Sequence, residues 1–312
     1  MHSTSSLISV VMSVYNGEDT LSITLDSILS QEGVDLEFIV VNDGSTDDTL
    51  QILDKYAAKD KRLKVLNQEN QGLTCSLIRG CAEAEGEFIA RQDAGDTSLS
   101  SRLYKQQSFL IENPDVVLVS CGTRFIGPTG EKLYEVIQSE ESASKGLHLF
   151  TIENIRGPSH HGSTMFRKKD YQAVGGYRAQ FQVAQDLDLW TRLVEQGRHC
   201  AIQDVLYQAC IARYAISIRK RNQQINTTKL ILECTLRRRS GQSEETILEQ
   251  ASKNQSHLAG ADYSRIRDSG FYYFLGCCLR NSDPEKAKNY FTLALKSNPL
   301  HLKALFRFLT TG

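Results

Sequence analysis

Short apolar runs alternate with helical patterns along the first part of the chain. Four of these runs are predicted as strands, at residues 7–14, 36–41, 63–66 and 88–90. The segments between them repeat apolar residues at the three-to-four-residue spacing of an amphipathic helix. The predicted strands are almost continuously apolar, which is typical of strands covered on both faces. The alternation therefore predicts an α/β fold, with a mainly parallel sheet and helices on both of its faces.

Polar side chains follow the predicted strands at the point where each one ends. Tyr15 comes after the first strand, Asp43 after the second, and Asp93 and Asp96 after the fourth. Ligands of a parallel sheet bind beyond the carboxyl ends of its strands. Two carboxylates placed there repel each other unless a cation or hydrogen-bond donors lie between them. We therefore expect a ligand site with a cation at this edge. The alternative is that Asp93 turns the chain and Asp96 caps the next helix.

The sequence has no glycine-rich phosphate loop. No Gly-x-Gly-x-x-Gly follows the first strand, and no Gly-Lys-Ser or Gly-Lys-Thr occurs in the chain. The nucleotide-binding fingerprint of a dehydrogenase is therefore absent. The phosphates of any bound nucleotide would need a cation or basic side chains, and the pair Asp93 and Asp96 suits a cation.

Another acidic candidate lies on a later predicted helix. Before it, the pattern predicts a helix over residues 100–112, a strand over 116–120, a hairpin over 127–137, a strand near 159–166 and a helix over 168–174. Leu187, Trp190 and Leu193 then define the buried face of a further helix. Asp186 and Asp188 lie about 200° apart around such a helix and cannot share one site. Asp186, just ahead of the apolar run, is expected to point from the helix N-terminus toward a cleft, unless it only caps the helix.

Basic residues gather between residues 213 and 239, with Glu233 as the only acid among them. They are Arg213, Arg219, Lys220, Arg221, Lys229, Arg237, Arg238 and Arg239. The part nearest Arg213 is expected to hold a diphosphate leaving group or to dock on an anionic membrane surface. The three arginines at the end of the run are expected to form a solvated helix face.

The chain changes character after about residue 243 and is predicted to be helical to its end. Residues 283–284, Asp-Pro, begin one helix, and residues 298–299, Asn-Pro, end it. Its alternation of small and large residues resembles one tetratricopeptide-type helical hairpin. A single repeat cannot stand alone, so we expect it to pack on the rest of the chain, on another subunit or on a partner. The predicted division is a first domain over 1–222 and a helical region over 223–312.

Composition narrows the class of protein and its location. The chain has 312 residues and a net charge of -1, which gives no overall bias toward nucleic acid. Its eight cysteines show no metal-binding spacing and are expected to be reduced thiols. Residues 1–6 do not resemble a signal peptide, and no apolar run reaches the roughly 18 residues of a membrane span. We expect a cytoplasmic protein, and peripheral contact with the inner face of the membrane stays open.

Four motifs in order give the chain a resemblance to a known family. They lie at residues 14–17, 41–47, 90–96 and 185–190. Residues 7–221 thereby resemble a family 2 glycosyltransferase with the Rossmann-like GT-A fold. The resemblance implies transfer of a sugar from a nucleotide-sugar, usually with inversion and with Mg²⁺ or Mn²⁺ on the diphosphate. It favours a UDP-sugar as donor. The implied acceptor is a hydroxyl of a glycan or lipid-linked molecule in surface polysaccharide or lipopolysaccharide synthesis.

The same resemblance implies roles for individual residues. Tyr15 and Asp43 would contact the nucleotide base, and Asp93 and Asp96 would bind ribose, diphosphate and metal. Asp186 would be the general base that takes the proton of the acceptor hydroxyl. The implied cofactor-binding set is Val14, Tyr15, Asp43, Arg91, Asp93 and Arg213, and the implied metal ligands are Asp93 and Asp96.

Two positions depart from the pattern of the family. Gly95 lies where an acid usually ligates the metal, so Asp96 would substitute for it or the donor phosphates would hold the metal. Gln185 replaces the acid that usually precedes the base. We expect this change to leave Asp186 with a lower pKa than it would have beside a second carboxylate.

Other interpretations stay open at this point. His160 and His161 lie where the family often has a histidine near the acceptor, but loop histidines would look the same. A decayed transferase domain could act as a binding or scaffold protein through its helical tail, although such a domain would have no reason to retain Asp43, Asp93 and Asp186 together. A nucleotidyltransferase is less favoured, because the glycine-rich N-terminal loop with a basic residue is missing. A homo-oligomer, and a protein partner for residues 213–312, also remain open.

Overall fold

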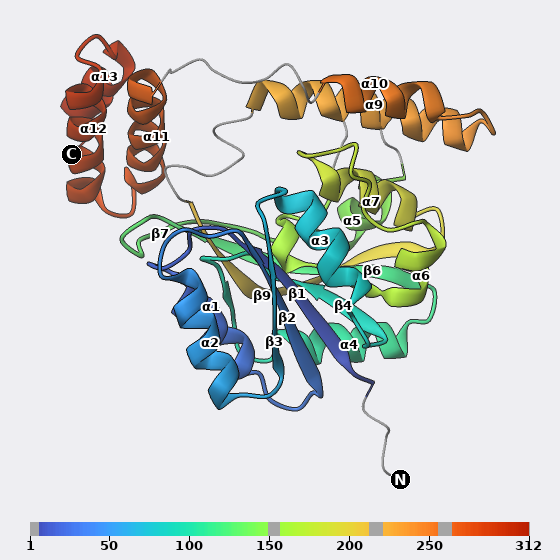
Figure 1. The fold of residues 1–312 in the computed structure, drawn as a ribbon. Helices are drawn as coiled ribbons and strands as arrows, with labels where there is room; N and C mark the ends of the chain where they lie inside the picture. Colours follow the sequence, from blue (N-terminus) through green and yellow to red (C-terminus); the bar gives the residue numbers. More distant parts are fainter. Residues whose placement is uncertain (1–5, 149–156, 212–220, 255–263, 312) are drawn as a thin grey trace.

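The computed structural model describes residues 6–148, 157–211, 221–254 and 264–311. Within these residues, one sheet of nine strands forms the centre of the molecule, and helices cover both of its faces (Figure 1). The strand order is β3-β2-β1-β4-β8-β6-β9-β5, and β7 pairs with β6. The predicted α/β class with a sheet between helices is confirmed.

The first half of the sheet is parallel and follows the predicted alternation. Its elements are β1 (Ile8–Val14), α1 (Leu21–Leu29), β2 (Leu36–Asp43), α2 (Thr49–Lys59), β3 (Leu63–Gln68), α3 (Leu73–Ala82) and β4 (Phe88–Arg91). β1 pairs in parallel with β2 and β4, and β2 pairs in parallel with β3. The carboxyl ends of β1, β2 and β4 therefore lie side by side, as the sequence predicts.

The second half of the sheet mixes parallel and antiparallel pairs. Its elements are β5 (Thr97–Ser98), α4 (Arg102–Glu112), β6 (Val116–Ile126), β7 (Lys132–Val136), α5 (Glu140–Gly146), β8 (Met165–Arg167), α6 (Lys168–Ala173), α7 (Gln185–Leu193) and β9 (Arg198–Cys210). β8 is antiparallel to β4 and β6, whereas β9 is parallel to β6 and antiparallel to β5. The sequence did not predict β5 or β9. The register between β6 and β9 shifts at several places, so β9 has no regular two-residue period.

Two apolar cores lie on opposite faces of the sheet. Val10 and Val11 are neighbours on β1, and their side chains enter different cores, as alternate positions of a strand must. One core is covered by α1, α2 and α4. The other is covered by α3, α6 and α7, and by two helices from later in the chain, α9 (Arg221–Arg239) and α10 (Glu245–Asn254).

Two of the three arginines at the end of the basic run, Arg238 and Arg239, do not form the solvated helix face that was expected, whereas Arg237 is 36% exposed and pairs with Glu233 within α9. Arg238 on α9 forms an ion pair with Glu195 at 2.6 Å and a second one with Glu244. Arg239 donates to the backbone carbonyl of His148 at 2.6 Å. These arginines fix α9 against the first domain. Arg213, Arg219 and Lys220 lie outside the described residues.

Three further helices complete the described chain, namely α11 (Ser264–Leu279), α12 (Pro284–Ser297) and α13 (Leu302–Thr310). α11 and α12 form a close hairpin, because a Cβ on Gly276 would lie 2.6 Å from the ring of Phe291. The hairpin packs on β7, where the rings of Tyr134 and Phe274 lie 6.3 Å apart and Leu133 joins the cluster of Leu275 and Phe291. The predicted helical tail is confirmed, and its boundary at residue 222 stays a prediction.

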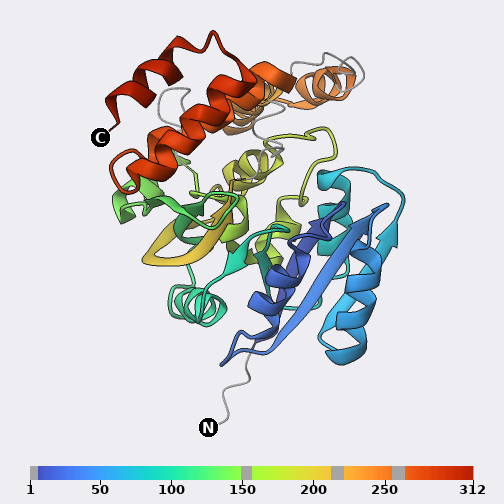
Figure 2. The same ribbon diagram turned by 90° about the vertical axis from the view of Figure 1, so that its left-hand side faces the viewer.

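The C-terminal helices lie beyond the edge of the sheet that carries the carboxyl ends of the first strands. Figures 1 and 2 show α9 to α13 on this side, with the start of β1 on the opposite side. Within the described ranges, each helix is too short or too polar to cross a membrane.

Candidate active site

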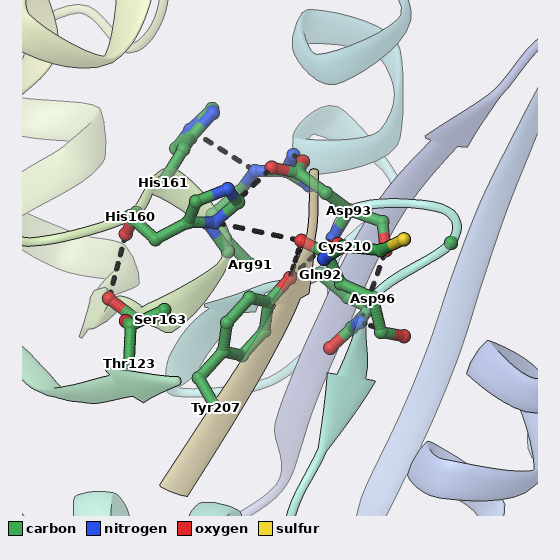
Figure 3. A network of polar contacts seen from close by, with 12 residues as sticks. Arg91, Gln92, Asp93, Asp96, Thr123, His160, His161, Ser163, Tyr207 and Cys210 are labelled. Atoms are coloured by element: carbon green, nitrogen blue, oxygen red, sulfur yellow. Dashed lines mark hydrogen bonds and ion pairs between the residues drawn. The ribbon is translucent and has the colours of Figure 1, made fainter. Parts of the chain in front are cut away.

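Side chains from several elements converge just beyond the end of β4. Asp93 and Asp96 come from the turn after β4, and His160 comes from the segment before the short 3₁₀ helix His161–Ser163. Tyr207 comes from β9 (Figure 3). The predicted pair of acids is therefore brought together, and residues about 65 and 110 positions later in the sequence complete the group.

Asp93, Asp96 and His160 form a cluster suited to a divalent cation. The His160 Nδ1 lies 3.8 Å from Asp93 Oδ2 and 3.7 Å from Asp96 Oδ2. These distances are too long for hydrogen bonds. One ligand atom from each residue lies within 4.8 Å of the other two. Two carboxylates and an imidazole can bind Mn²⁺, and the carboxylates can also bind Mg²⁺.

Asp93 is held as a carboxylate by a buried arginine. The guanidinium of Arg91 is fully buried, and its Nη2 lies 2.7 Å from Asp93 Oδ1. Burial has the largest single effect and would raise the pKa of Asp93, but the positive charge of Arg91, together with smaller contributions from His161, His160 and Arg102, outweighs it, so the pKa lies below its ordinary value. Arg91 also donates to the carbonyl of Val11 and to His161 Nε2, which fixes its position against β1. Asp93 Oδ2 is left facing His160.

Asp96 is less well neutralised. It is only 5% exposed, and it accepts hydrogen bonds from the Tyr207 hydroxyl and the Cys210 backbone N–H, both at 2.9 Å. Burial, with the negative charge of Asp93 adding to it, raises the pKa of Asp96 to about 6 in spite of these donors. The cluster therefore has more negative charge than the protein compensates, which is what a cation site needs before the cation binds.

Tyr207 connects the two acids, and sequence reasoning missed it. Its hydroxyl accepts from the Asp93 backbone N–H at 3.1 Å and donates to Asp96. Its ring stacks on His160 with centroids 5.3 Å apart. A Cβ on Gly162 would lie 1.9 Å from the Tyr207 hydroxyl oxygen, so this position requires glycine. In the sequence, the run His160-His161-Gly162 indicated that this segment could belong to the site. Leu206 and Tyr207, by contrast, look like ordinary core residues.

His161 does not share the role of its neighbour. It is buried, and its Nε2 lies 2.7 Å from the Tyr177 hydroxyl. Burial lowers the pKa of His161 to about 3, so the ring is neutral at ordinary pH. His161 therefore supports Arg91, and only His160 of the two faces the acids.

Asp186 lies in the first turn of α7, which follows Ala184, a residue in a left-handed conformation with φ 54°. Its Oδ1 accepts the backbone N–H of Leu187 at 2.9 Å, and the helix N-terminus favours a negative charge there. Burial raises the pKa of Asp186, and the charge of Asp93 raises it further. The two carboxylates are therefore near enough to interact electrostatically. A raised pKa suits a group that must accept a proton.

Asp188, on the same helix, has an entirely different environment. It is 1% exposed, and its Oδ2 lies 2.5 Å from Nη2 of Arg192, which is itself 2% exposed. Arg178 lies 3.7 Å from its other oxygen. Asp188 therefore belongs to an ion pair inside the protein.

The residues predicted to contact the nucleotide lie at the same edge of the sheet, in different environments. Tyr15 is 52% exposed, whereas Val14 is 2% exposed. Asp43 accepts three hydrogen bonds from the β3–α3 segment: Gln68 Nε2 at 2.7 Å, Gln71 N at 2.9 Å and Gly72 N at 2.8 Å. Both oxygens of Asp43 thus fix the loop before α3. Arg213 lies outside the described residues.

Gly95 occupies the position of the missing acid in a backbone conformation that favours glycine. Its φ is +91°, and its N–H donates to Thr24 Oγ1 at 3.0 Å. An aspartate here would be strained as well as close to Thr20, whose Oγ1 would lie 3.3 Å from the new Cβ. His160 lies opposite the two acids and can supply the third ligand.

The sequence matches a known family over more than half of its length. Residues 9–175 match the family described as glycosyl transferase family 2. The Bacillus subtilis protein EpsE, provisionally named a glycosyltransferase, is 35% identical over 209 residues, which cover 64% of this chain and 72% of EpsE. The O-antigen biosynthesis glycosyltransferase WbnJ of Escherichia coli is 30% identical over 61% of this chain and 72% of its own length.

Solved structures share the fold. Residues 1–349 of S. aureus TarS, in complex with UDP, align with a TM-score of 0.58 at 17% identity, covering 97% of this chain and 89% of that one. The mannosyltransferase PcManGT of Pyrobaculum calidifontis, in complex with GDP-Man and Mn²⁺, aligns with a TM-score of 0.56 at 18% identity, covering 97% of this chain and 87% of that one.

Proposed function

The chain belongs to glycosyl transferase family 2 and is a glycosyltransferase, and on this premise we propose an inverting transfer from a UDP-sugar. The proposed acceptor is a hydroxyl of a glycan or lipid-linked molecule in surface polysaccharide or lipopolysaccharide synthesis. The name of WbnJ, an O-antigen biosynthesis enzyme, supports this acceptor class. TarS is in complex with UDP and PcManGT with GDP-Man, so structural neighbours bind uridine as well as guanosine nucleotides. The choice of a UDP-sugar for this chain therefore rests on the family resemblance.

The observation that carries the proposal is the arrangement of three carboxylates around one edge of the sheet. Asp93 and Asp96 form a cluster with His160, and Asp186 interacts with Asp93 from the N-terminus of α7. In an inverting transfer, the acceptor oxygen attacks the anomeric carbon from the side opposite the leaving diphosphate. A base on the acceptor side and a charge-stabilising group on the diphosphate side are the two requirements. The two parts of the site can supply them.

Asp186 performs the proton transfer in this mechanism. Its carboxylate accepts the proton of the acceptor hydroxyl as the new bond from oxygen to the anomeric carbon forms. The bond from that carbon to the diphosphate oxygen breaks at the same time, and the nucleoside diphosphate leaves. Burial, which raises the pKa of Asp186, makes its carboxylate a better base than an exposed aspartate.

Asp93, Asp96 and His160 would hold Mg²⁺ or Mn²⁺. A bound divalent cation neutralises charge on the leaving diphosphate. The donor atoms within 4.8 Å of one another and the raised pKa of Asp96 support this assignment. Arg91 orients Asp93 and cannot reach a ligand itself, because its side chain is fully buried. We therefore assign Arg91 a positioning role in place of direct contact with the cofactor.

Calorimetric titration of the full chain tests the donor and the metal. UDP, GDP and dTDP are each titrated with and without Mn²⁺, and we expect UDP to bind only with Mn²⁺. Binding of GDP or dTDP in place of UDP would change the donor class. Binding without metal would assign the diphosphate to basic side chains. Binding of none would favour the scaffold interpretation.

The substitution Asp186→Asn tests the base. It should lower turnover by roughly 10²- to 10⁴-fold and leave UDP binding unchanged. Asp204→Asn is the matched control, because Asp204 is an exposed acid paired with Lys105 at 2.6 Å. It should keep normal turnover. Near-normal turnover of the Asp186 variant would show that the assigned base is wrong.

A further inference from the structure

The last helix, α13, exposes a stripe of large apolar side chains. Leu302, Phe306 and Leu309 are 73%, 62% and 71% exposed, and Leu305 is 42% exposed. At 100° per residue, these four side chains fall within about 100° of arc around the helix. Leu300, just before the helix, is 83% exposed. Contiguous apolar side chains with this exposure are typical of an interaction surface. We call these five residues the α13 stripe.

The opposite side of α13 is fixed to the protein. Ala304 is fully buried, and Phe308 packs on the cluster that joins α11 and α12 to β7. The helix is thus held in place by one apolar side and presents the α13 stripe outward, at the outer end of the helical region (Figure 1). A helix that only completed this fold would have a polar outer face.

The sequence around the α13 stripe has basic residues and no acidic ones. From residue 286 to residue 312 the chain has no Asp or Glu, and its basic residues are Lys286, Lys288, Lys296, Lys303 and Arg307. Lys286 pairs with Asp283 at 3.1 Å. Among the described residues, Lys288, Lys296 and Lys303 form no ion pair with an acidic side chain. The positive charge of this stretch is therefore not balanced by acidic residues within it.

The basic side chains lie next to the apolar ones. Lys303 and Arg307 are one turn apart on α13, at one side of the stripe. With Tyr273, Leu302 and Phe306 they line a hollow of about 460 Å³. The hollow offers two positive charges and an aromatic hydroxyl beside an apolar surface. This combination is complementary to a phosphate-bearing headgroup above its acyl chains.

We propose that α13 docks the enzyme on an anionic lipid surface. The α13 stripe enters the boundary between headgroups and acyl chains, and Lys303 and Arg307 lie at the level of the phosphates. Helices with an apolar face flanked by Lys and Arg bind membranes in this way, in the plane of the interface. If a second copy of the chain packed on this surface, two sets of unpaired Lys and Arg side chains would face each other, with no acidic residue between 286 and 312 to balance them. The charge therefore favours the lipid surface.

The position of α13 gives this docking a consequence for the site. α11 to α13 lie beyond the same edge of the sheet as the carboxyl ends of β1, β2 and β4 (Figures 1 and 2). A membrane bound at α13 would lie on that side of the molecule. Docking does not depend on the proposed donor or acceptor, but it would bring a lipid-linked acceptor toward the site.

Co-sedimentation of the full chain with vesicles tests the proposal. One set of vesicles is phosphatidylcholine alone, and the other has about one third phosphatidylglycerol. We expect the bound fraction to be several-fold higher on the anionic vesicles and to fall as salt is raised. Equal or absent binding to both sets would overturn the proposal.

Two pairs of substitutions separate the apolar and the electrostatic contributions to vesicle binding. Phe306→Ser with Leu309→Ser, and independently Lys303→Gln with Arg307→Gln, should each reduce binding to anionic vesicles several-fold. Ile111→Ser is the matched control, since Ile111 is 54% exposed on α4, and it should bind as the unchanged protein does. All variants should melt normally and transfer sugar normally to a water-soluble acceptor.

Two results would contradict the proposal even if the protein binds vesicles. One is a variant at Phe306 and Leu309 that binds as tightly as the unchanged protein. The other is a dimer, seen by analytical ultracentrifugation, that the same substitutions dissociate. The α13 stripe would then be an interface between copies of the chain.

Discussion

The hydroxyl of Tyr207 donates to Asp96 Oδ2 at 2.9 Å and accepts the backbone N–H of Asp93 at 3.1 Å. One side chain from β9 thus fixes both ends of the turn that carries the two acids. Its ring also stacks on His160. Tyr207 thus contacts His160 as well as the two acids, so it determines the geometry of all three residues of the cluster.

Tyr207→Phe should weaken the metal site without unfolding the protein. It removes the donor to Asp96, so the pKa of Asp96 should rise further, and it leaves the Asp93 N–H without its acceptor. A lost hydrogen bond to a charged group costs about 1.5–3 kcal/mol, so we expect Mn²⁺-dependent UDP binding to weaken by roughly tenfold or more. Calorimetry measures this change. Tyr134→Phe is the control, and equal affinity for both variants would contradict the assigned role.

The raised pKa of Asp96 predicts a pH-dependent stability in the absence of metal. The folded pKa of about 6 lies above the ordinary 3.8, so the stability that this group contributes is present at low pH and is lost as pH rises through 6. Burial lowers the pKa of His161 and of His199, and those groups act in the opposite direction in the same range. The effect must therefore be measured as a difference between variants.

Asp96→Asn isolates the contribution of this carboxyl. In denaturant unfolding without metal, the variant should gain stability relative to the unchanged protein at pH 7.5, and the gain should shrink at pH 5 where Asp96 is protonated. Adding Mn²⁺ at pH 7.5 should stabilise only the unchanged protein. A difference between the two proteins that does not vary with pH would mean that Asp96 has an ordinary pKa.

Gly162→Ala tests how closely the histidine segment approaches β9. The new Cβ would lie 1.9 Å from the Tyr207 hydroxyl oxygen, so the ring or the segment must move. Overpacking of this kind typically costs about 1–3 kcal/mol, and the displaced Tyr207 should also weaken Mn²⁺-dependent UDP binding. Gly270→Ala is the control, because nothing lies within 4 Å of a Cβ there. Gly162→Ala should lower both the free energy of unfolding and the affinity for UDP. Gly270→Ala should leave the affinity unchanged and should not lower the stability, because alanine forms a helix better than glycine.

The sequence predicted the first half of the fold better than the second. β1 to β4 are continuous apolar runs separated by amphipathic helices, so local pattern and final structure agree. β9 has no such pattern, because bulges shift its register against β6 and part of it is exposed. Long-range pairing determines this strand, and a single sequence carries little information about it.

The sequence likewise predicted only some residues of the candidate site. Asp93, Asp96 and Asp186 were found because each lies at the end of a recognisable element. Tyr207 and the buried role of Arg91 were missed, because they depend on pairings between strands that are distant in sequence, namely β8 with β4 and β9 with β5 and β6. Asp43 was expected to contact a base, and its three hydrogen bonds to the β3–α3 segment could not be inferred before that loop was seen.

The two acids of α7 should respond differently to the same substitution. Asp188→Asn removes the buried partner of Arg192 and leaves that guanidinium uncompensated at 2% exposure, which typically costs about 3–5 kcal/mol. Asp186→Asn removes a carboxylate whose pKa burial already raises, so it should keep or slightly increase the free energy of unfolding. Chemical denaturation at pH 7.5 compares the two. A marked loss of stability in the Asp186 variant would indicate a structural residue, and its loss of turnover could then not be assigned to a missing base.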